Sequence, residues 1–221
     1  MLEAMTPPTI LLDVDGTLVD SFPGIRAGFL YALDTVGHPQ PSEDFIARIP
    51  GPPMEHTLAS LGLDEKTCQE AFNAYMDYTR GGGWQEAQAF PGVPELLERW
   101  RNDGFRLITA TSKGEGFARA ILQREGLLEH FSFIGAAEEY GTRRSKTDVL
   151  QYIFDKVDLD PQRAVMVGDR THDIAGAAAF GIDTIAVTWG YGDQSEWDTA
   201  RFTAHTMEEL DQLVRSFHAA H

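Results

Sequence analysis

The stretch Ile10–Thr17 reads I-L-L-D-V-D-G-T, in which an apolar run ends at two carboxylates one residue apart. Residues i and i+2 of a strand face the same side, so Asp13 and Asp15 can address one site just beyond a buried strand. Gly16 lets the backbone turn away without steric cost. Two crowded acids repel each other unless a cation or a shared proton relieves them. The octet therefore predicts Mg²⁺ binding together with acid/base chemistry, with a plain surface turn as the alternative.

The composition is that of a globular protein with a strong negative charge. The chain has 221 residues, of which 43% are hydrophobic and 24% charged, and its formal net charge is −16. Such a charge repels nucleic acid polymers and anionic membranes, so neither is expected as a partner. A small anionic substrate is still compatible, because a bound metal and a few cations can dominate inside a cleft. We expect a small phosphorylated metabolite as the partner and a monomeric protein.

The cellular compartment is inferred from cysteine usage and from the start of the chain. Cys68 is the single cysteine and has no internal partner, which favours a reducing, cytoplasmic compartment. Its surroundings resemble an amphipathic helix, so we expect a packed thiol rather than a nucleophile. No stretch is apolar and long enough to span a bilayer. Residues Met1–Pro8 lack the pattern of a signal peptide and are expected to form a frayed tail.

Short apolar runs alternate with helical patterns along most of the chain. The alternation predicts an α/β fold, a Rossmann-like parallel sheet covered by helices on both faces, with ligands beyond the carboxyl ends of the strands. The expected strands are Thr9–Val14, Phe105–Thr111, Ala164–Gly168 and Thr184–Thr188, with a weaker one at Phe131–Gly135. The expected helices are Val93–Asp103, Gly116–Gly126, Lys146–Val157, Asp173–Phe180 and Met207–Phe217.

One segment interrupts this alternation. Residues 20–89 show helical patterns and no convincing strand, and turn-forming residues mark both ends of the segment. We therefore predict a small all-α cap domain at 20–89, inserted into an α/β core formed by 1–19 and 90–221. Because the insertion begins directly after the carboxylate pair, it is expected to lie over that site as a lid.

Polar groups follow two further strands and one helix start. The run T-S-K places the hydroxyls of Thr111 and Ser112 at a strand end, which suits an anion site at a helix N-terminus. Simple N-capping by Ser112 is the alternative. Lys146 begins a helix, where the macrodipole disfavours a cation. This unfavourable position suggests that the lysine is there to contact a phosphate. A solvated surface lysine is the competing interpretation.

The run V-M-V-G-D-R-T-H-D ends another strand with two acids, Asp169 and Asp173. Carboxylate oxygens are preferred ligands of hard cations, so this pair is a candidate Mg²⁺ site. Capping of the following helix is an alternative, stronger for Asp173 than for Asp169. His172 lies between them, and we favour loop packing or a substrate-edge role for it over metal ligation.

Taken in order, these patterns resemble the four signatures of the haloacid dehalogenase superfamily of phosphotransferases. D-V-D-G-T looks like the first, Thr111 in A-T-S-K the second, Lys146 the third and G-D-R-T-H-D the fourth. The inserted helices resemble that superfamily's C1 cap. Three short motifs are most similar to the phosphoglycolate phosphatase and 5′-nucleotidase-like branch; they are G-P-P at 51–53, P-G-V at 91–93 and W-G-Y-G at 189–192.

The resemblance implies a role for each motif residue. Asp13 would be the nucleophile and Asp15 the general acid and base. Thr111 and Lys146 would bind the phosphoryl oxygens, together with backbone N–H groups. The Mg²⁺ ligands would be Asp13, the backbone carbonyl of Asp15, Asp169 and Asp173, the last directly or through water. Further substrate-binding residues would be Gly16, Ser112, Arg48 and Gly51.

Further predictions concern three arginines and one glycine turn. Arg48 and the turn at Gly51 belong to the inserted segment and are expected to contact the leaving group, against the alternatives of a surface arginine and a helix-packing turn. Arg143 and Arg144 flank the lysine motif and are expected to be solvated rather than catalytic.

The expected activity is an Mg²⁺-dependent phosphatase that hydrolyses small phosphomonoesters, such as phosphoglycolate or nucleoside monophosphates, through an aspartyl-phosphate. Dehalogenation is disfavoured, because similar dehalogenases lack the second Asp of the pair. Two alternatives stay open: a phosphomutase that needs a bisphosphate primer, and a catalytically silent binding or regulatory protein on the same fold.

Overall fold

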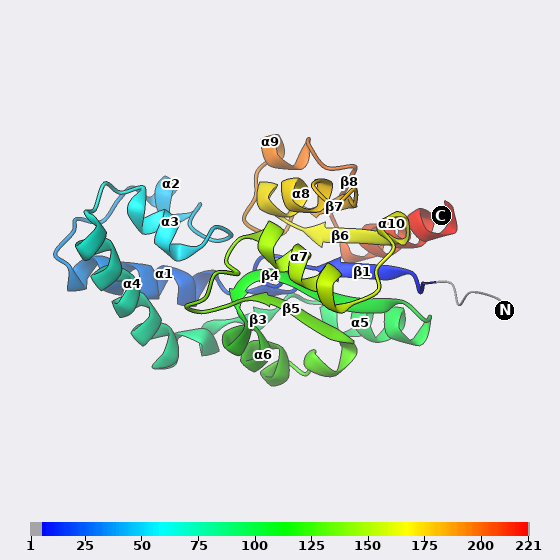
Figure 1. The fold of residues 1–221 in the computed structure, drawn as a ribbon, viewed down its shortest axis with the longest axis horizontal. Helices are drawn as coiled ribbons and strands as arrows, with labels where there is room; N and C mark the ends of the chain where they lie inside the picture. Colours follow the sequence, from blue (N-terminus) through cyan, green and yellow to red (C-terminus); the bar gives the residue numbers. More distant parts are fainter. Residues whose placement is uncertain (1–5, 221) are drawn as a thin grey trace.

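A computed structural model describes residues 6–220 of the chain; the start of the expected N-terminal tail, residues 1–5, lies outside the described part. Its centre is a six-stranded sheet with the order β5-β4-β1-β6-β7-β8 and parallel pairing throughout (Figure 1). The strands are β1 (Thr9–Leu12), β4 (Arg106–Gly114), β5 (Phe133–Ala137), β6 (Ala164–Gly168), β7 (Asp183–Val187) and β8 (Phe202–Ala204). The predicted α/β class with a parallel sheet is confirmed.

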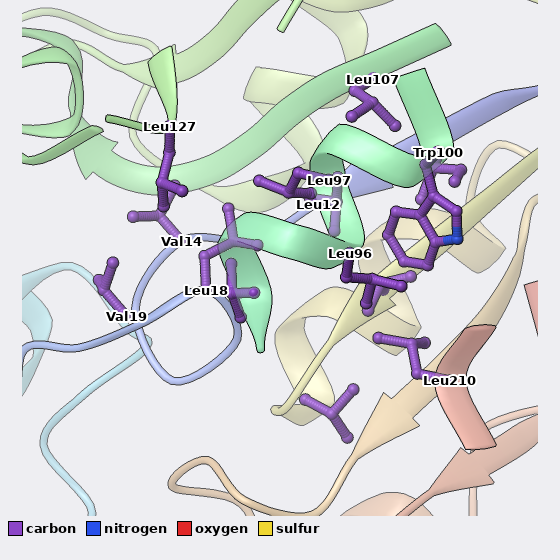
Figure 2. Packing of buried hydrophobic residues seen from close by; sticks show 14 of the residues in the cluster. Leu12, Val14, Leu18, Val19, Leu96, Leu97, Trp100, Leu107, Leu127 and Leu210 are labelled. Carbon is purple, nitrogen blue, oxygen red and sulfur yellow. The ribbon is translucent and has the colours of Figure 1, made fainter. Parts of the chain in front are cut away.

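Helices cover both faces of the sheet because the side chains of each strand alternate between two hydrophobic clusters. On β1, Ile10 and Leu12 belong to one cluster and Leu11 to the other. The first cluster packs against α5 (Val93–Asn102), α6 (Glu115–Arg124) and α10 (Met207–Ala220), with Trp100 among its fully buried members (Figure 2). The second packs against α7 (Lys146–Lys156) and α8 (Thr171–Ala178).

A helical insert, defined here as residues 20–89, follows the first strand and lies beyond the carboxyl ends of the sheet (Figure 1). Its helices pack around a hydrophobic cluster of their own, which includes Phe29, Leu33, Leu58 and Phe72. Cys68 packs against this cluster, as predicted for a structural thiol. The helices of the insert are α1 (Phe22–Thr35), α2 (Glu43–Ile46), α3 (Met54–Ala59) and α4 (Glu65–Arg80), followed by the 3₁₀ turn Gly83–Glu86.

The expectation that 20–89 contains no strand is wrong at its two ends. The segments β2 (Val19–Asp20) and β3 (Gln88–Ala89) pair antiparallel, with Val19 opposite Ala89. Two-residue strands are too short to show a period in sequence. The pair ties the entry and exit of the insert together, so the insert is joined to the sheet by a narrow, two-stranded connection.

Other differences concern short or irregular elements. Strand β8 and helix α9 (Gln194–Trp197) were not expected, because segments of three or four residues carry little periodic signal. Strand β4 runs past Thr111 to Gly114, with a register shift between these two residues against β5. Helix α6 therefore begins only at Glu115, and its N-cap residue is Gly114.

Within residues 6–220, none of the helices combines the length and hydropathy needed to cross a bilayer.

Candidate active site

Three buried carboxylates meet where the carboxyl ends of β1 and β6 adjoin. Asp13 follows β1, and its N–H donates to the carbonyl of Val167 at 3.0 Å. Asp169 follows β6, and Asp173 lies in the first turn of α8. One oxygen of each carboxylate lies within 4.8 Å of those of the other two. The structure therefore brings together three of the predicted metal-ligating residues.

Lys146 provides a cation inside this cluster. It begins α7, only 5% of its surface is exposed, and its Nζ lies 3.0 Å from Asp13 Oδ1 and 2.6 Å from Asp173 Oδ1. The ammonium also donates to the carbonyl of Ala110. Burial lowers the pKa of Lys146, but the two carboxylates outweigh it and the net pKa is raised. The interpretation of Lys146 as a solvated surface lysine is thus wrong.

The donor set of the cluster suits a hard divalent cation. Burial raises the pKa of Asp13 to about 6, against a lowering by Lys146, and raises the pKa of Asp169 well above its usual range. Asp169 Oδ1 is buried without a hydrogen-bond partner in the described structure. A divalent cation would engage this orphaned oxygen and favour the ionised carboxylates. The cluster could therefore bind a metal such as Mg²⁺.

Asp173 accepts hydrogen bonds from nearby backbone N–H groups and is also part of the acidic cluster. Its Oδ2 accepts hydrogen bonds from the N–H groups of Asp169 at 3.1 Å and Arg170 at 3.0 Å, while Oδ1 faces Lys146. The predicted capping role and the predicted place in the acidic cluster therefore both hold for this residue. His172 is exposed on the same helix and is not part of the cluster.

Asp15 lies beside the cluster and faces the pocket with two partners that the sequence reasoning did not identify. Lys113 Nζ contacts Asp15 Oδ2 at 2.7 Å, and Ser21 Oγ donates to Oδ1 at 2.5 Å. Burial lowers the pKa of Lys113, but Asp15 and other negative neighbours raise it overall. In the sequence, Lys113 is visible only as the lysine that ends the run T-S-K. A single lysine does not show where its ammonium will lie in the folded protein.

A pocket opens between the sheet edge and the helical insert, with about 730 Å³ of empty space when its solvent-open mouth is included. The wall on the sheet side includes Asp13, Asp15, Thr111 and Ser112, and the insert adds Gly51. Ser112 does not cap α6, because two residues separate it from Glu115 and the N-cap residue is Gly114. These five predicted site residues therefore line one cavity.

Two predicted substrate-binding residues lie elsewhere. Gly16 has a φ of +79°, and a Cβ there would come within 2.3 Å of Asp169 Oδ2, so this glycine permits close approach to the acidic cluster rather than lining the pocket. The side chain of Arg48 is exposed and pairs with Asp193 at 3.7 Å. Among the expectations for Arg48, the surface arginine agrees with this placement.

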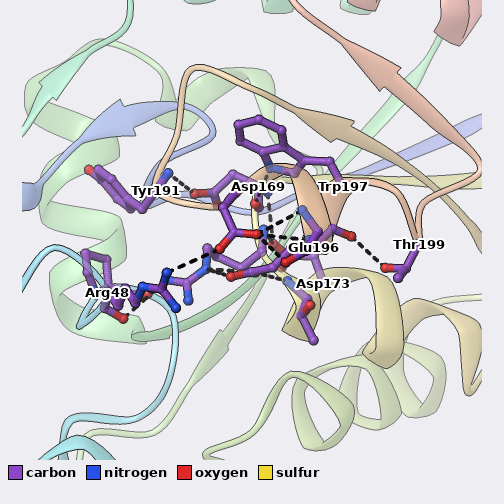
Figure 3. Close-up of polar contacts among 12 residues, drawn as sticks. Arg48, Asp169, Asp173, Tyr191, Glu196, Trp197 and Thr199 are labelled. Carbon is purple, nitrogen blue, oxygen red and sulfur yellow. Dashed lines mark hydrogen bonds and ion pairs between the residues drawn. The ribbon is translucent and has the colours of Figure 1, made fainter. Parts of the chain in front are cut away.

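The segment after β7, which includes helix α9, donates two hydrogen bonds to Asp169 (Figure 3). Tyr191 donates its backbone N–H to Asp169 Oδ2 at 2.6 Å, and the indole of Trp197 donates to the Asp169 carbonyl at 3.0 Å. The phenol of Tyr191 also donates to Asp20 at 2.9 Å and accepts from the N–H of Ser21 at 2.8 Å. One tyrosine thus joins the acidic cluster to the first strand of the insert.

Arginines connect the sheet to the insert. Arg170 is buried, pairs with Glu196 at 3.0 Å and donates to the carbonyl of Pro50 in the insert. The expectation that Arg143 and Arg144 are solvated is wrong, because both are half-buried. Arg143 lies over the ring of Tyr152 at 3.8 Å, and the contacts of Arg144 cross to the insert.

Residues 10–187 match the haloacid dehalogenase-like hydrolase family. The chain belongs to this family. The matched segment spans both the acidic cluster and the helical insert, and it contains all four motifs that resemble the signatures of this family.

This haloacid dehalogenase-like hydrolase is similar to proteins with different names. It is 44% identical over 213 residues to the tyrosine-protein kinase PtkA of Mycobacterium tuberculosis, covering 95% of this chain and 73% of the relative. It is 36% identical to a 5′-nucleotidase of Pseudomonas aeruginosa, covering 87% and 88% of the two chains. The structure of a predicted phosphatase from Clostridium acetobutylicum superposes with a TM-score of 0.90 at 29% identity, covering 95% of this chain and 99% of that one.

Proposed function

We propose that this protein is an Mg²⁺-dependent phosphatase that hydrolyses small phosphomonoesters, of the phosphoglycolate or nucleoside monophosphate kind, through an aspartyl-phosphate on Asp13. The single observation that carries the proposal is the position of Asp13, which belongs to the acidic cluster, contacts the Lys146 ammonium and lies on the wall of a pocket that Asp15 shares. Membership of a hydrolase family and relatives named as phosphatases support it.

In the first step, a carboxylate oxygen of Asp13 attacks phosphorus, and the bond from phosphorus to the leaving oxygen breaks. Asp15, held by Lys113 and Ser21 at the pocket, gives its proton to that leaving oxygen. Lys146 favours the ionised form of Asp13 that this attack requires. The leaving oxygen departs as an alcohol group, and Asp13 carries the phosphoryl group.

In the second step, water attacks the phosphorus of the aspartyl-phosphate. Asp15 accepts the proton of the water, and the bond from phosphorus to Asp13 breaks, which releases inorganic phosphate and restores the carboxylate. The Thr111 hydroxyl and Lys146 would orient the phosphoryl oxygens.

Mg²⁺, when held by Asp13, Asp169, Asp173 and the backbone carbonyl of Asp15, would neutralise charge on the phosphoryl oxygens. The orphaned Asp169 Oδ1 is the feature of this chain that supports such a site.

We propose that the helical insert acts as the lid of the pocket, as a separate cap domain. It has its own hydrophobic cluster and joins the core through the β2–β3 connection, a construction that suits a moving element. Contacts from Arg144 and Arg170 to the insert would hold the closed position.

The test is phosphate release from about thirty metabolite phosphomonoesters, with and without Mg²⁺, with the Asp13→Asn variant as the blank. We expect Mg²⁺-dependent release with a preference measured as kcat/KM. No release above the blank from any compound would reject the phosphatase. Release that requires a bisphosphate primer would point to the mutase.

A second candidate function is phosphoryl transfer to protein tyrosine, because the relative that is 44% identical is named a tyrosine-protein kinase. Incubation with γ-labelled ATP and a tyrosine-containing polypeptide separates the two candidates. Label in tyrosine would support the kinase, and label recovered only as inorganic phosphate would exclude it.

A further inference from the structure

The side of the pocket that faces the helical insert is apolar. The insert contributes aliphatic, thioether and aromatic side chains to it, and α6 adds one phenyl ring. These lining residues are Ile25, Ile49, Met54, Phe72, Tyr75, Met76 and Phe117. Apolar and aromatic walls stabilise a bound group by excluding water and by ring contacts, and methionine sulfur adapts to aromatic faces.

The cationic groups that line the pocket lie on its core side, and each has a carboxylate partner in the structure. The cationic lining residues are Lys113 and Arg144, and each is paired with a carboxylate. Lys113 contacts Asp15 at 2.7 Å, and Arg144 contacts the two oxygens of Glu55 at 2.6 and 2.8 Å. Glu139 adds a further carboxylate to the wall.

Arg144 has little capacity left for a second anion. Its Nη2 is engaged by Glu55, and its Nη1 donates to the carbonyls of Glu138 and Glu139. Its Nε has no partner in the described structure, but this atom is buried. A ligand carboxylate at Arg144 would therefore have to displace Glu55, and that displacement leaves a partly buried charge unpaired.

We infer that the leaving group is neutral and carries an aromatic ring, and that short anionic leaving groups such as glycolate are rejected. This inference rests on the proposed phosphatase function and specifies its substrate class. The ring would lie against Phe72 and its apolar neighbours, while the phosphoryl group lies at Asp13. A nucleobase and a benzene ring share this chemistry.

Three primary alkyl phosphates test the inference, because they have comparable scissile bonds and differ in the rest of the leaving group. They are benzyl phosphate, uridine 5′-monophosphate and 2-phosphoglycolate, assayed with Mg²⁺. We expect kcat/KM for at least one aromatic substrate to exceed that for 2-phosphoglycolate by about tenfold or more, as unpaired charge in a pocket predicts. The better of the two aromatic substrates identifies the kind of ring.

The outcomes separate the inference from the function on which it rests. A best substrate with an anionic or ring-free leaving group would overturn the inference and leave the phosphatase intact. No phosphate release from any compound of the larger panel would overturn the phosphatase itself.

A variant that frees Arg144 gives an independent test. In Glu55→Gln, Arg144 loses its carboxylate partner, so the ratio of kcat/KM for 2-phosphoglycolate over benzyl phosphate is expected to rise about threefold or more. The matched control is Glu43→Gln, which removes the exposed insert pair Arg26–Glu43 and should leave the ratio unchanged. An unchanged ratio in Glu55→Gln would contradict the proposed role of the Arg144–Glu55 pair.

Discussion

At the scale of single residues, the site depends on a buried ammonium that contacts two carboxylates at once. Lys146 lies within 3.0 Å of both Asp13 and Asp173, and all three side chains are almost inaccessible to water. The Coulomb interaction among them is strong because little solvent screens it. Removal of Lys146 would leave two buried carboxylates without their shared cation.

Replacement of the nucleophile is the direct test at this scale. Asp13→Asn keeps the size of the side chain but removes the attacking carboxylate, so turnover is expected to fall by about 10³-fold or more. Circular dichroism should show an unchanged fold. Retained activity in the folded variant would reject Asp13 as the nucleophile.

Replacement of Lys146 should affect stability as well as rate. In Lys146→Met, the carboxylates of Asp13 and Asp173 lose their shared cation, and the free energy of unfolding of the metal-free protein is expected to fall by about 3–5 kcal/mol. Urea denaturation measures the change. Lys156→Met, at the exposed end of the same helix, is the matched control and should change stability by less than about 0.5 kcal/mol. Equal effects of the two substitutions would argue against the buried pair.

At the scale of elements, the connection between the sheet and the insert is held by a loop far away in sequence. The phenol of Tyr191 donates a hydrogen bond to Asp20 and accepts hydrogen bonds from the N–H groups of Ser21 and Phe22. The backbone N–H of Tyr191 donates to Asp169. The first strand of the insert and the acidic cluster are thereby positioned by the same residue.

Loss of the Tyr191 hydroxyl should loosen this connection. In Tyr191→Phe, the N–H of Ser21 loses its hydrogen-bond partner, so hydrogen exchange of the Ser21 amide is expected to accelerate about tenfold or more. Tyr152→Phe, a tyrosine on α7, is the control. Unchanged exchange at Ser21 would show that the phenol does not restrain the connection.

At the scale of the whole molecule, stability should depend on pH and on metal through the acidic cluster. The pKa of Asp13 is raised from its ordinary value of 3.8 to about 6, so the folded state binds this proton more tightly than the unfolded state does. A raised pKa contributes stability that is present below the unfolded pKa and is lost as pH rises through the folded one. The window is therefore roughly pH 4 to 6.

Chemical denaturation of the metal-free protein across this window gives the test. Relative to Asp13→Asn, the wild type is expected to lose up to about 3 kcal/mol between pH 4 and pH 6, and addition of Mg²⁺ at pH 7.5 should restore stability to the wild type more than to the variant. Parallel pH profiles of the two proteins would contradict the raised pKa of Asp13.

The order of motifs along the chain determined where the chemistry lies. Apolar runs that end at Asp13, Thr111 and Asp169 predict strands of one parallel sheet, and parallel strands present their carboxyl ends at one edge; the structure places these three strands side by side. The fold class and the meeting of these residues could therefore be predicted from sequence. The long helical insert also followed from its periodicity, whereas β2, β3, β8 and α9 are too short to produce a readable period.

The tertiary structure alone decided which charges are neutralised and by what. Lys146 is buried only in the folded protein. The ion pairs Lys113–Asp15 and Arg144–Glu55 and the hydrogen bond from Tyr191 to Asp20 join segments that are distant in sequence. Charge and residue type are properties of the sequence. Burial and distance, on which the strength of an ionic contact depends, exist only once the helices have packed on the sheet and the insert has packed over its edge.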